Sequence, residues 1–257
     1  MKLLRIQEME AYILKNGSAS LDELCEEFNV SKNTIRRDIN KLVENGVIRK
    51  VYGGVTAVEK SLVSFENRKV RNQAEKTRIA REAANFIKDD DLIFIDSGTT
   101  TKSILSALDP NISITVLTNS LDVINAATGF ERIHLIVIGN SYKHKTRSFV
   151  GIDGAAILQK YNIHKAFMSA TGVSIAHGLT NADQLEYEIK KIAAEKAREV
   201  FLLADQSKFG KSTLLTYAPF NRIDHLITSA PLDKEYEAYC QDHHIEVVVA
   251  AEHHVAN

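Results

Sequence analysis

The sequence predicts two domains of different fold class: a small helical domain that ends in a β-hairpin, and a larger α/β domain built on a mostly parallel sheet. Three observations support this. Helical periodicity fills about the first 45 residues, strand-like runs alternate with helical segments through most of the remainder, and a polar, unperiodic stretch separates the two patterns. We place the domains at residues 1–57 and 75–257, joined by a linker at 58–74.

The bulk composition is that of a globular protein. The chain has 257 residues, 44% of them hydrophobic and 25% charged, which is enough to bury a sizeable core. Its net charge of −1 means that any nucleic-acid role must come from a local basic patch. Cys25 and Cys240 are not spaced like metal ligands, and we interpret both as small, buried apolar residues. Two such free thiols fit a protein of the reducing cytosol. With no signal peptide and no membrane-length apolar run, we expect a cytoplasmic protein without membrane contact.

The first domain contains three predicted helices. They cover roughly residues 3–15, residues 20–28, and a segment that starts at Ser31, a good N-cap, and ends near Asn45-Gly46. Only Asn29-Val30 separates the second helix from the third, which is typical of a helix-turn-helix. The stretch VIRKVYGGV then predicts two short strands joined by a Gly-Gly turn.

The third helix has one apolar face and one face suited to DNA. Its apolar stripe consists of Ile35, Ile39, Leu42 and Val43. The outward side carries Asn33, Arg36, Arg37, Asn40 and Lys41. Arginine can pair bidentately with guanine and asparagine with adenine, while Ser31 and Thr34 at the helix start suit backbone phosphate.

The charge around this helix strengthens the DNA interpretation. Residues 31–52 hold six basic side chains against two acidic ones. Arg49 and Lys50, on the hairpin, could rest on phosphate or enter the minor groove as a wing. The alternative is a solvated helix face with no ligand. The short turn, the basic excess and the basic hairpin together favour a winged helix-turn-helix that binds double-stranded DNA.

The second domain alternates strands with helices, which predicts a mostly parallel sheet covered on both faces. The predicted strands are LIFI, ISITVLT, IHLIVI, KAFMSA, EVFLLA, HLITS and IEVVVA. The predicted helices are REAANFIK, TKSILSAL, a segment from Leu121, and QLEYEIKKIAAEKAR. In the last of these, Leu185, Ile189 and Ile192 are interpreted as helix core.

The loop after strand LIFI is a candidate anion site. It contains Asp96, Ser97, Gly98, Thr99 and Thr100, and a helix is predicted to follow. Glycine allows close backbone approach, and threonine hydroxyls with free N–H groups can donate to phosphate. The alternative is an ordinary tight turn capped by threonine. In a parallel sheet such a loop lies at the carboxyl edge, where ligands bind.

Other strand ends supply further polar groups. Asn119, Gly172, Asp205 and Lys208 each follow a predicted strand. Lys208 could neutralise a phosphate, although a solvated loop lysine is the commoner case. Asp96 and Asp205 could bind sugar hydroxyls or could serve as caps. Arg147 is a weaker candidate.

The chain resembles the DeoR family of bacterial transcriptional repressors. The resemblance rests on Arg5, Met9 and Ile13, on SKNTIRRDI and NGVIRKVYGGV, and on IDSGTTT, LTNS, SATGVS, GLT and ADQSKFG, so it covers nearly the whole chain. It implies a second domain similar to ribose-5-phosphate isomerase that senses phosphorylated sugars. One departure is Gly139-Asn140-Ser141, where the family usually shows Gly-Gly.

Three functions remain open at this point. The first, which we favour, is a repressor controlled by a phosphorylated sugar. The second is a sugar-phosphate isomerase with an accessory DNA-binding domain, but residues 169–180 hold His177 and no carboxylate that could act as base; Asp183 and Glu186 come later. In the third, the second domain only oligomerises. We expect a homodimer or homotetramer, no cofactor and no metal, since the pairs His243-His244 and His253-His254 lack a ligand pattern.

Overall fold

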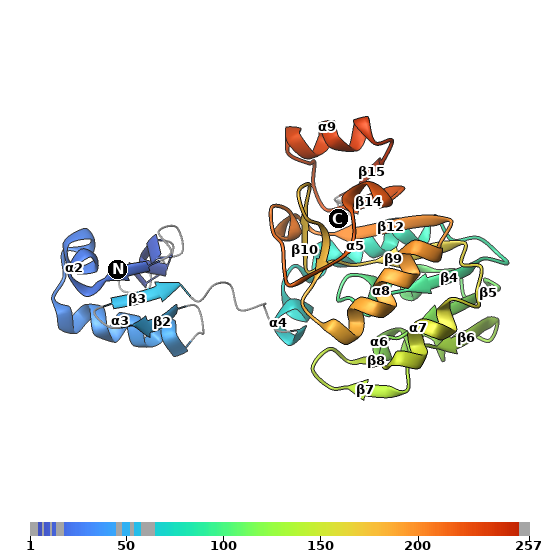
Figure 1. The fold of residues 1–257 in the computed structure, drawn as a ribbon, viewed down its shortest axis with the longest axis horizontal. Coiled ribbons are helices and arrows are strands. Elements are labelled where there is room, and N and C mark those ends of the chain that lie inside the picture. Colours follow the sequence, from blue (N-terminus) through green and yellow to red (C-terminus); the bar gives the residue numbers. More distant parts are fainter. Residues whose placement is uncertain are drawn as a thin grey trace, which may run out of the picture. The chain divides into compact units, whose positions relative to one another are not determined.

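The computed structural model describes residues 5–6, 8–10, 12–13, 18–44, 48–51, 54–57 and 65–251. It divides the chain into two compact units, Met1–Ser64 and Phe65–Asn257 (Figure 1). Each unit has its own hydrophobic core. The boundary between the units falls within the range 58–74 that we predicted as a linker, and the last ten residues of that range belong to the second unit.

The first unit combines helices with a three-stranded antiparallel sheet. The described residues within 5–13 are helical. They are followed by β1 (Ser18–Ser20), α2 (Leu21–Phe28), α3 (Lys32–Glu44), β2 (Ile48–Val51) and β3 (Gly54–Ala57). The strand order is β1-β3-β2, with Val51 opposite Gly54 in the hairpin. This is the predicted winged helix-turn-helix, with β1 as an additional strand. Of the predicted Gly-Gly turn, only Gly54 is among the described residues, and the predicted C-cap at Asn45-Gly46 lies outside them.

The core of the first unit follows the predicted periodicity. Ile35, Ile39 and Leu42 of α3 are buried and pack with Met9 and Ile13 of the first helical segment. Val43 and Cys25 are partly buried against the same cluster. The apolar stripe of α3 is thereby fixed inward, which turns its polar side outward.

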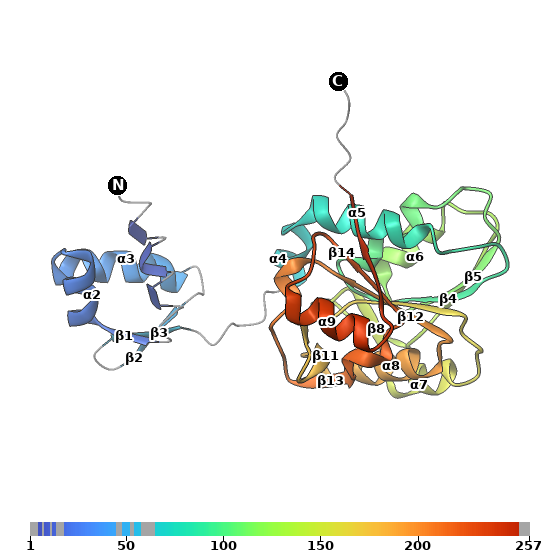
Figure 2. The same ribbon diagram turned by 90° about the horizontal axis from the view of Figure 1, so that it is seen from above.

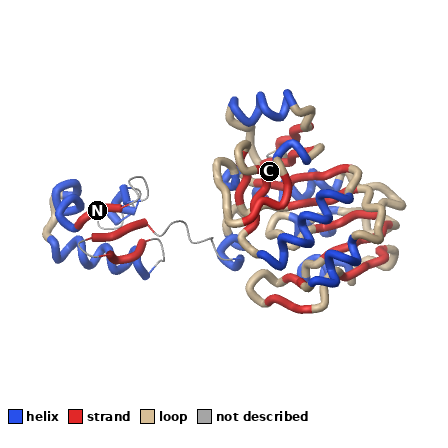
Figure 3. Tube along the Cα trace, viewed as in Figure 1, coloured by secondary structure: helices blue, strands red, loops and turns tan. Residues whose placement is uncertain are grey.

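The second unit is an α/β domain. Its helices are α4 (Phe65–Val70), α5 (Gln73–Ala84), α6 (Leu121–Ala127), α7 (Ile152–Leu158), α8 (Gln184–Lys196) and α9 (Lys234–Asp242). Its main strands are β4 (Leu92–Ile95), β5 (Ile114–Thr118), β6 (Ile133–Val137), β9 (Lys165–Met168), β12 (Glu199–Ala204), β14 (His225–Thr228) and β15 (Glu246–Val249). These seven form a fully parallel sheet in the order β15-β14-β12-β9-β4-β5-β6. Figure 3 shows the strands of the second unit in red among its helices in blue.

Helices cover both faces of this sheet, as predicted. Figure 2 shows α5 and α6 on one side and α7, α8 and α9 on the other. The two buried clusters match these sides: Ile79, Val123 and Phe201 belong to one, and Leu158 and Ile189 to the other. Burying both faces explains why the strands read as continuous apolar runs and not as alternating ones.

Two smaller sheets complete the unit. β10 (Gly172–Ser174), β11 (Gly178–Asn181) and β13 (Leu215–Ala218) form an antiparallel sheet, and β7 (Ser141–Lys143) pairs with β8 (Ser148–Val150) in a hairpin. Short 3₁₀ turns follow three strands: η1 (Thr101–Ser103) with η2 (Leu105–Ala107), η3 (Gln206–Lys208) and η4 (Phe220–Arg222).

Two predictions in this unit were wrong. TKSILSAL is not one α-helix but the two 3₁₀ turns η1 and η2, so no continuous helix dipole points at the preceding loop. Leu185 is not core, since its side chain is 50% exposed, whereas Ile189 is fully buried and Ile192 is partly buried. Leu185 lies in the first turn of α8, just after the N-cap Asp183.

Within the described ranges, no helix is both long and apolar enough to cross a membrane. The same ranges contain no group of three or more His, Cys, Asp or Glu side chains placed to hold a metal ion. His243 instead stacks on Tyr239 at 4.0 Å between ring centroids. The pair 253–254 lies outside the described residues.

Candidate functional site

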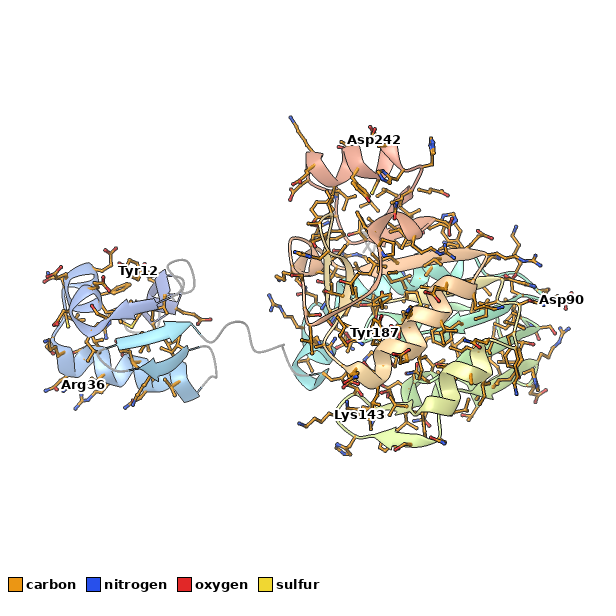
Figure 4. All side chains as sticks on the ribbon, in the orientation of Figure 1. Tyr12, Arg36, Asp90, Lys143, Tyr187 and Asp242 are labelled. Carbon is orange, nitrogen blue, oxygen red and sulfur yellow. The ribbon has the colours of Figure 1, made fainter. Side chains whose placement is uncertain are left out.

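The outward surface of α3 carries the predicted DNA-reading residues together. These side chains are exposed: Asn33, Arg36, Arg37, Asn40 and Lys41. Figure 4 shows Arg36 projecting outward from α3. An exposed helix face with guanidinium and amide groups matches the hydrogen-bonding pattern of base edges in the major groove.

The start of α3 is set by a tight turn. Asn29 caps α2 in the left-handed region at φ 47°, and only Val30 and Ser31 precede α3. The backbone N–H of Thr34 donates to Ser31 Oγ at 3.4 Å, which makes Ser31 the N-cap as predicted. Ser31 and Thr34 hydroxyls also contact each other at 3.1 Å, at the end of the helix where a phosphate would be favoured.

An ion pair removes one acidic charge from this surface. Asp38 is buried, and its Oδ2 accepts hydrogen bonds from Arg5 Nε at 2.9 Å and Nη2 at 2.7 Å. The pair ties the first helical segment to α3. In contrast, Lys32 pairs with Asp22 on the surface at 2.5 Å, and a pair this exposed contributes little stability. The basic face of α3 is therefore presented without the Asp38 charge.

The hairpin contributes the predicted wing. Lys50 lies on β2, opposite Val55 of β3, and is exposed. Arg49 lies opposite Thr56, but its side chain is outside the described part of the structure. The strand position of both residues is consistent with the wing prediction.

The second group of candidate residues meets at the carboxyl edge of the parallel sheet. The predicted residues Asp96, Asn119 and Asp205 follow β4, β5 and β12, and Ser169, which was not predicted, follows β9. These four strands are neighbours in the sheet order β12-β9-β4-β5. All four residues are buried. We call this set, with Ser97, Gly98, Thr99, Thr100 and Lys208, the strand-end site.

The loop after β4 offers unused backbone donors. Within the described residues, the N–H groups of Ser97, Gly98, Thr99 and Thr100 donate no hydrogen bond, although all four residues are buried. Buried N–H groups normally have a partner, so a row of unpaired ones indicates a place for an acceptor. Successive N–H groups of this kind form an anion-binding concavity.

Gly98 is required by the packing of this loop. A Cβ at Gly98 would lie 1.9 Å from Ser169 Oγ and 2.4 Å from Ser169 Cβ. Ser169 in turn donates to Asp96 Oδ2 from its hydroxyl at 2.5 Å and from its backbone N–H at 3.1 Å. The glycine therefore lets the loop lie against the end of β9, and the close backbone approach that we predicted is made to Ser169.

Only one of the two carboxylate oxygens of Asp96 has hydrogen-bond partners within the described part of the protein. Lys190 of α8 donates from Nζ to Asp96 Oδ2, and also to the Ser169 carbonyl at 3.0 Å. Asp96 Oδ1 is buried without a hydrogen-bond partner among the described residues. The capping alternative thus accounts for one oxygen of Asp96 and leaves the other free to accept.

Lys208 is a buried lysine and not a solvated loop residue. Its relative exposure is 9%. Burial lowers the pKa of Lys208 to about 8; the Asp205 carboxylate opposes this shift, while nearby Arg68 and Lys76 add to it. Burial also raises the pKa of Asp205, but hydrogen bonds from Ser207 and the positive charges of Lys208 and Lys76 outweigh it, so the net pKa is lowered.

Two cations that the sequence analysis missed lie at this edge. Arg68 of α4 interacts electrostatically with Glu186 and Asp96, and burial lowers its pKa. Lys76 of α5 is buried, and its pKa is lowered chiefly by burial. Together with Lys208 they bring three positive charges into one neighbourhood. Such an arrangement stabilises an anion.

Glu186 is a third residue that was not assigned to the site. It is buried on α8, where Ser148 Oγ donates to its Oε1 at 2.7 Å and Ser97 Oγ lies at 3.5 Å. Asn181 Nδ2 lies 3.5 Å from its other oxygen. Neutral hydrogen-bond donors thus hold the Glu186 carboxylate next to the loop that follows β4.

Other predicted residues have structural partners. Asn119 Nδ2 donates to the Phe149 carbonyl at 3.2 Å, while its Oδ1 is buried and lacks a partner among the described residues. Gly172 begins β10, and a Cβ there would lie 2.6 Å from the Lys211 carbonyl oxygen, so its role is close packing. Arg147 pairs with Asp122 at 2.7 Å and so is already engaged in an ion pair.

The missed residues left only weak signals. Glu186 and Lys190 are four residues apart on α8, a spacing that also describes an ordinary surface ion pair. Arg68 lies in the stretch that we interpreted as linker. Burial of charged side chains cannot be inferred from spacing alone, because lysine, arginine and glutamate are usually exposed.

Comparison with known proteins identifies both units. Residues 5–61 match the family model described as DeoR-like helix-turn-helix domain, and residues 71–230 match the DeoR C terminal sensor domain. The chain is 67% identical over 251 residues to the HTH-type transcriptional regulator IolR of Bacillus subtilis (strain 168). The alignment covers 97% of this chain and 100% of the relative.

More distant proteins are also similar. The glycerol-3-phosphate regulon repressor of Escherichia coli (strain K12) is 29% identical, over 91% of this chain and 94% of the relative. Among solved structures, ribose 5-phosphate isomerase A from Methanocaldococcus jannaschii aligns with a TM-score of 0.40 and 22% identity, over 54% of this chain and 55% of that one.

The two matched models account for the two units in turn. A helix-turn-helix domain binds DNA, and a sensor domain binds a small effector. We predicted a regulator and kept an isomerase as the alternative. The similarity to a transcriptional regulator along nearly the full chain confirms the regulator. The chain therefore belongs to the DeoR family of helix-turn-helix transcriptional regulators, and it is a regulator and not an enzyme.

Proposed function

We propose that the protein represses a carbohydrate-metabolism operon, and that a phosphorylated sugar bound at the strand-end site sets its affinity for operator DNA. It acts in the cytoplasm as a homodimer or homotetramer. The observation that carries the effector assignment is the row of unpaired N–H groups from the buried residues Ser97 to Thr100, at the same edge of the sheet as the buried Lys208. Backbone donors and a lysine are the groups that bind phosphate in proteins.

The sugar part of the effector has its own partners in this proposal. Asp96 Oδ1, Asn119 Oδ1 and Asp205 Oδ2 are buried acceptors without partners among the described residues. Sugar hydroxyls can donate to all three, and a buried acceptor gains most from being satisfied. A relative named for a glycerol-3-phosphate regulon is consistent with a phosphorylated polyol or sugar as the effector class.

The operator contacts are assigned to α3 and the wing. Arg37, Asn33 and Asn40 read base edges, while Arg36 and Lys41 hold phosphates. Ser31 and Thr34 bind the backbone at the helix start, and Arg49 with Lys50 does so from the hairpin. The support is the shared exposure of the described side chains on one surface and the short turn that positions α3.

The effector proposal is tested with paired ligands. A thermal-shift screen of sugar phosphates, each beside its unphosphorylated sugar, identifies the ligand, and calorimetry measures its affinity. Only the phosphorylated form should bind and change operator affinity, since each charge-assisted hydrogen bond that the neutral sugar forfeits contributes about 1.5–3 kcal/mol. Because coupling between sites is reciprocal, operator DNA should change effector affinity by the same factor.

The matching variants separate the two sites. The double substitution Thr99→Ala with Lys208→Ala should abolish the response to the sugar phosphate and leave operator binding intact. The control is Lys160→Ala, which removes an exposed lysine from the same unit. A normal response in the double variant, or equal binding of the unphosphorylated sugar, contradicts the proposal.

A further inference from the structure

The short helix α4 is the first element of the second unit after the boundary at Ser64. Its C-terminal turn is held by a buried side chain: Lys76 Nζ donates to the Arg68 carbonyl, and to the Arg71 carbonyl at 2.8 Å. The residue that follows the turn reaches a strand end, because Asn72 Nδ2 donates to Asp205 Oδ1 at 3.2 Å. The segment 65–72 is thereby attached to the strand-end site.

Arg68, on this segment, lies close enough to charged residues of the strand-end site to interact with them electrostatically. The positive charge of Arg68 lowers the pKa values of Lys208 and Lys76. The carboxylates of Glu186 and Asp96 in turn raise the pKa of Arg68, against the effect of its burial. Its Nε is buried and has no hydrogen-bond partner among the described residues. A partly buried guanidinium with a buried, unused N–H near the buried Lys76 and Lys208 lacks what it binds best, an oxyanion.

We propose that Arg68 binds the anionic group of the effector, and that α4 is the element through which effector occupancy reaches the chain leading to the DNA-binding unit. The inference rests on the proposed effector function and adds to it a binding residue and a route. It requires the anion to contact Arg68 in the same neighbourhood as Lys208 and the loop Ser97–Thr100. A ligand can shift a conformational equilibrium only by contacts that differ between the two states.

Arg68 supplies such a differential contact. Without an anion, Arg68, Lys76 and Lys208 repel one another, and the Arg68 Nε donor is unsatisfied. With an anion, the repulsion is offset and the donor is used, so the position of α4 becomes coupled to occupancy. Lys76 and Asn72 transmit this restraint to the backbone, because they bind the carbonyls of the segment and Asp205.

The first test compares two arginines of the same segment. Arg68→Gln and Arg71→Gln remove the same charge, but Arg71 is exposed. The probe is inorganic phosphate, titrated calorimetrically into the full-length protein, followed by the sugar phosphate found in the thermal-shift screen. Arg68→Gln should weaken binding of both probes at least tenfold, Arg71→Gln less than twofold, and Arg68→Lys by an intermediate factor, since lysine keeps the charge but not the guanidinium.

The second test measures α4 directly. Hydrogen–deuterium exchange of the amides in residues 65–72 should slow when the sugar phosphate binds the wild type and the Arg71→Gln variant, and should not change in Arg68→Gln. Thermal unfolding establishes that each variant is folded, and Arg68→Lys serves as the reporter if Arg68→Gln is not. The role of α4 is overturned if Arg68→Gln loses affinity for the sugar phosphate but exchange in residues 65–72 of the wild type does not slow on binding.

The outcomes separate this inference from the function on which it rests. If the wild type binds the sugar phosphate, Lys208→Ala abolishes binding and Arg68→Gln binds normally, the role of Arg68 is overturned while the effector site stands. If neither inorganic phosphate nor any sugar phosphate binds the wild type, the proposed function is overturned and the inference with it. Weakened binding in Arg68→Gln with unchanged operator affinity in the absence of ligand supports the inference.

Discussion

At the scale of single residues, the buried lysine of the strand-end site should make effector binding depend on pH. Burial lowers the pKa of Lys208 to about 8; Asp205 opposes the shift, and Arg68, Lys76 and Lys211 add to it. A phosphomonoester is a dianion above about pH 6 and holds a neighbouring lysine protonated. Binding above pH 8 therefore takes up a proton, and affinity should fall by up to about tenfold per pH unit.

Calorimetry of the sugar phosphate between pH 7 and 9.5 measures this dependence. The affinity of the wild type should be nearly constant up to about pH 8 and decline beyond it, because the free protein loses the Lys208 proton. Lys208→Gln should bind weakly at every pH and show no such decline. A flat profile in the wild type would show that Lys208 does not contact the phosphate.

A second residue-scale prediction concerns Gly98. In Gly98→Ala the new methyl group would meet Ser169 Oγ at 1.9 Å, and Ser169 is hydrogen-bonded to Asp96 and cannot turn away without losing that bond. Overpacking of this kind costs about 1–3 kcal/mol. The variant should unfold at lower denaturant concentration in its second unit and lose sugar-phosphate binding. Gly129→Ala is the control, because its Cβ would have only the Ala126 carbonyl oxygen nearby, at 3.7 Å.

At the scale of elements, α3 connects the core of the first unit with its proposed operator contacts. Its buried side is fixed by Ile35, Ile39 and Leu42, so the direction of Arg36 and Arg37 follows from the packing. Ser20 strengthens the preceding helix through a capping box: its Oγ accepts from the Glu23 N–H at 3.1 Å, while its own N–H donates to Glu23 Oε2 at 2.7 Å. The capping box therefore fixes where α2 begins, while Asn29 in the left-handed region ends α2 just before the turn to α3.

Two substitutions on α3 should have different signatures. Arg37→Ala should cost roughly 1–3 kcal/mol of operator binding and relax specificity, because a bidentate contact to a base is lost. Arg36→Ala should weaken operator and unrelated duplexes alike and reduce the salt dependence, since a phosphate contact is lost. Gel shifts with both duplexes at several salt concentrations measure this. Glu27→Ala, exposed on α2, is the control, and unchanged affinity in both arginine variants would refute the assignment.

At the scale of the whole molecule, the size of the reading surface predicts an oligomer. One recognition helix contacts few base pairs, and DNA-binding proteins of this class reach specificity by placing two helices on two half-sites. We expect a dimer or tetramer formed by the second unit. Light scattering at micromolar concentration, with and without operator DNA, should give at least twice the mass of one chain, and a monomer under both conditions would contradict the prediction.

A truncated protein provides the matched control for that measurement. Residues 65–257 form a compact unit with its own two-sided core, so this piece should keep the oligomeric state and the effector affinity of the full chain while losing DNA binding. Oligomerisation that disappears with the first unit would place the interface elsewhere.

Much of the architecture could be predicted from local patterns. Apolar residues at helical spacing identified the buried side of α3, and the runs LIFI and EVFLLA coincide with β4 and β12. The alternation of strands and helices was enough for a parallel sheet with both faces covered. Local propensity was insufficient for TKSILSAL, which forms two 3₁₀ turns, and for Leu185, which lies on the exposed side of α8.

The sequence by itself determined the two domains, the exposed basic side of α3 and the polar loop after β4, because each is encoded by neighbours in the chain. Only the tertiary structure decided that Lys76, Glu186 and Lys190 are buried at the strand-end site and that the partly buried Arg68 lies near them. Parallel strands require long crossovers, so their carboxyl ends unite residues from distant segments. Charged side chains are expected in solvent until the fold supplies opposite charges and hydrogen bonds that offset their burial, and those partners come from elsewhere in the chain.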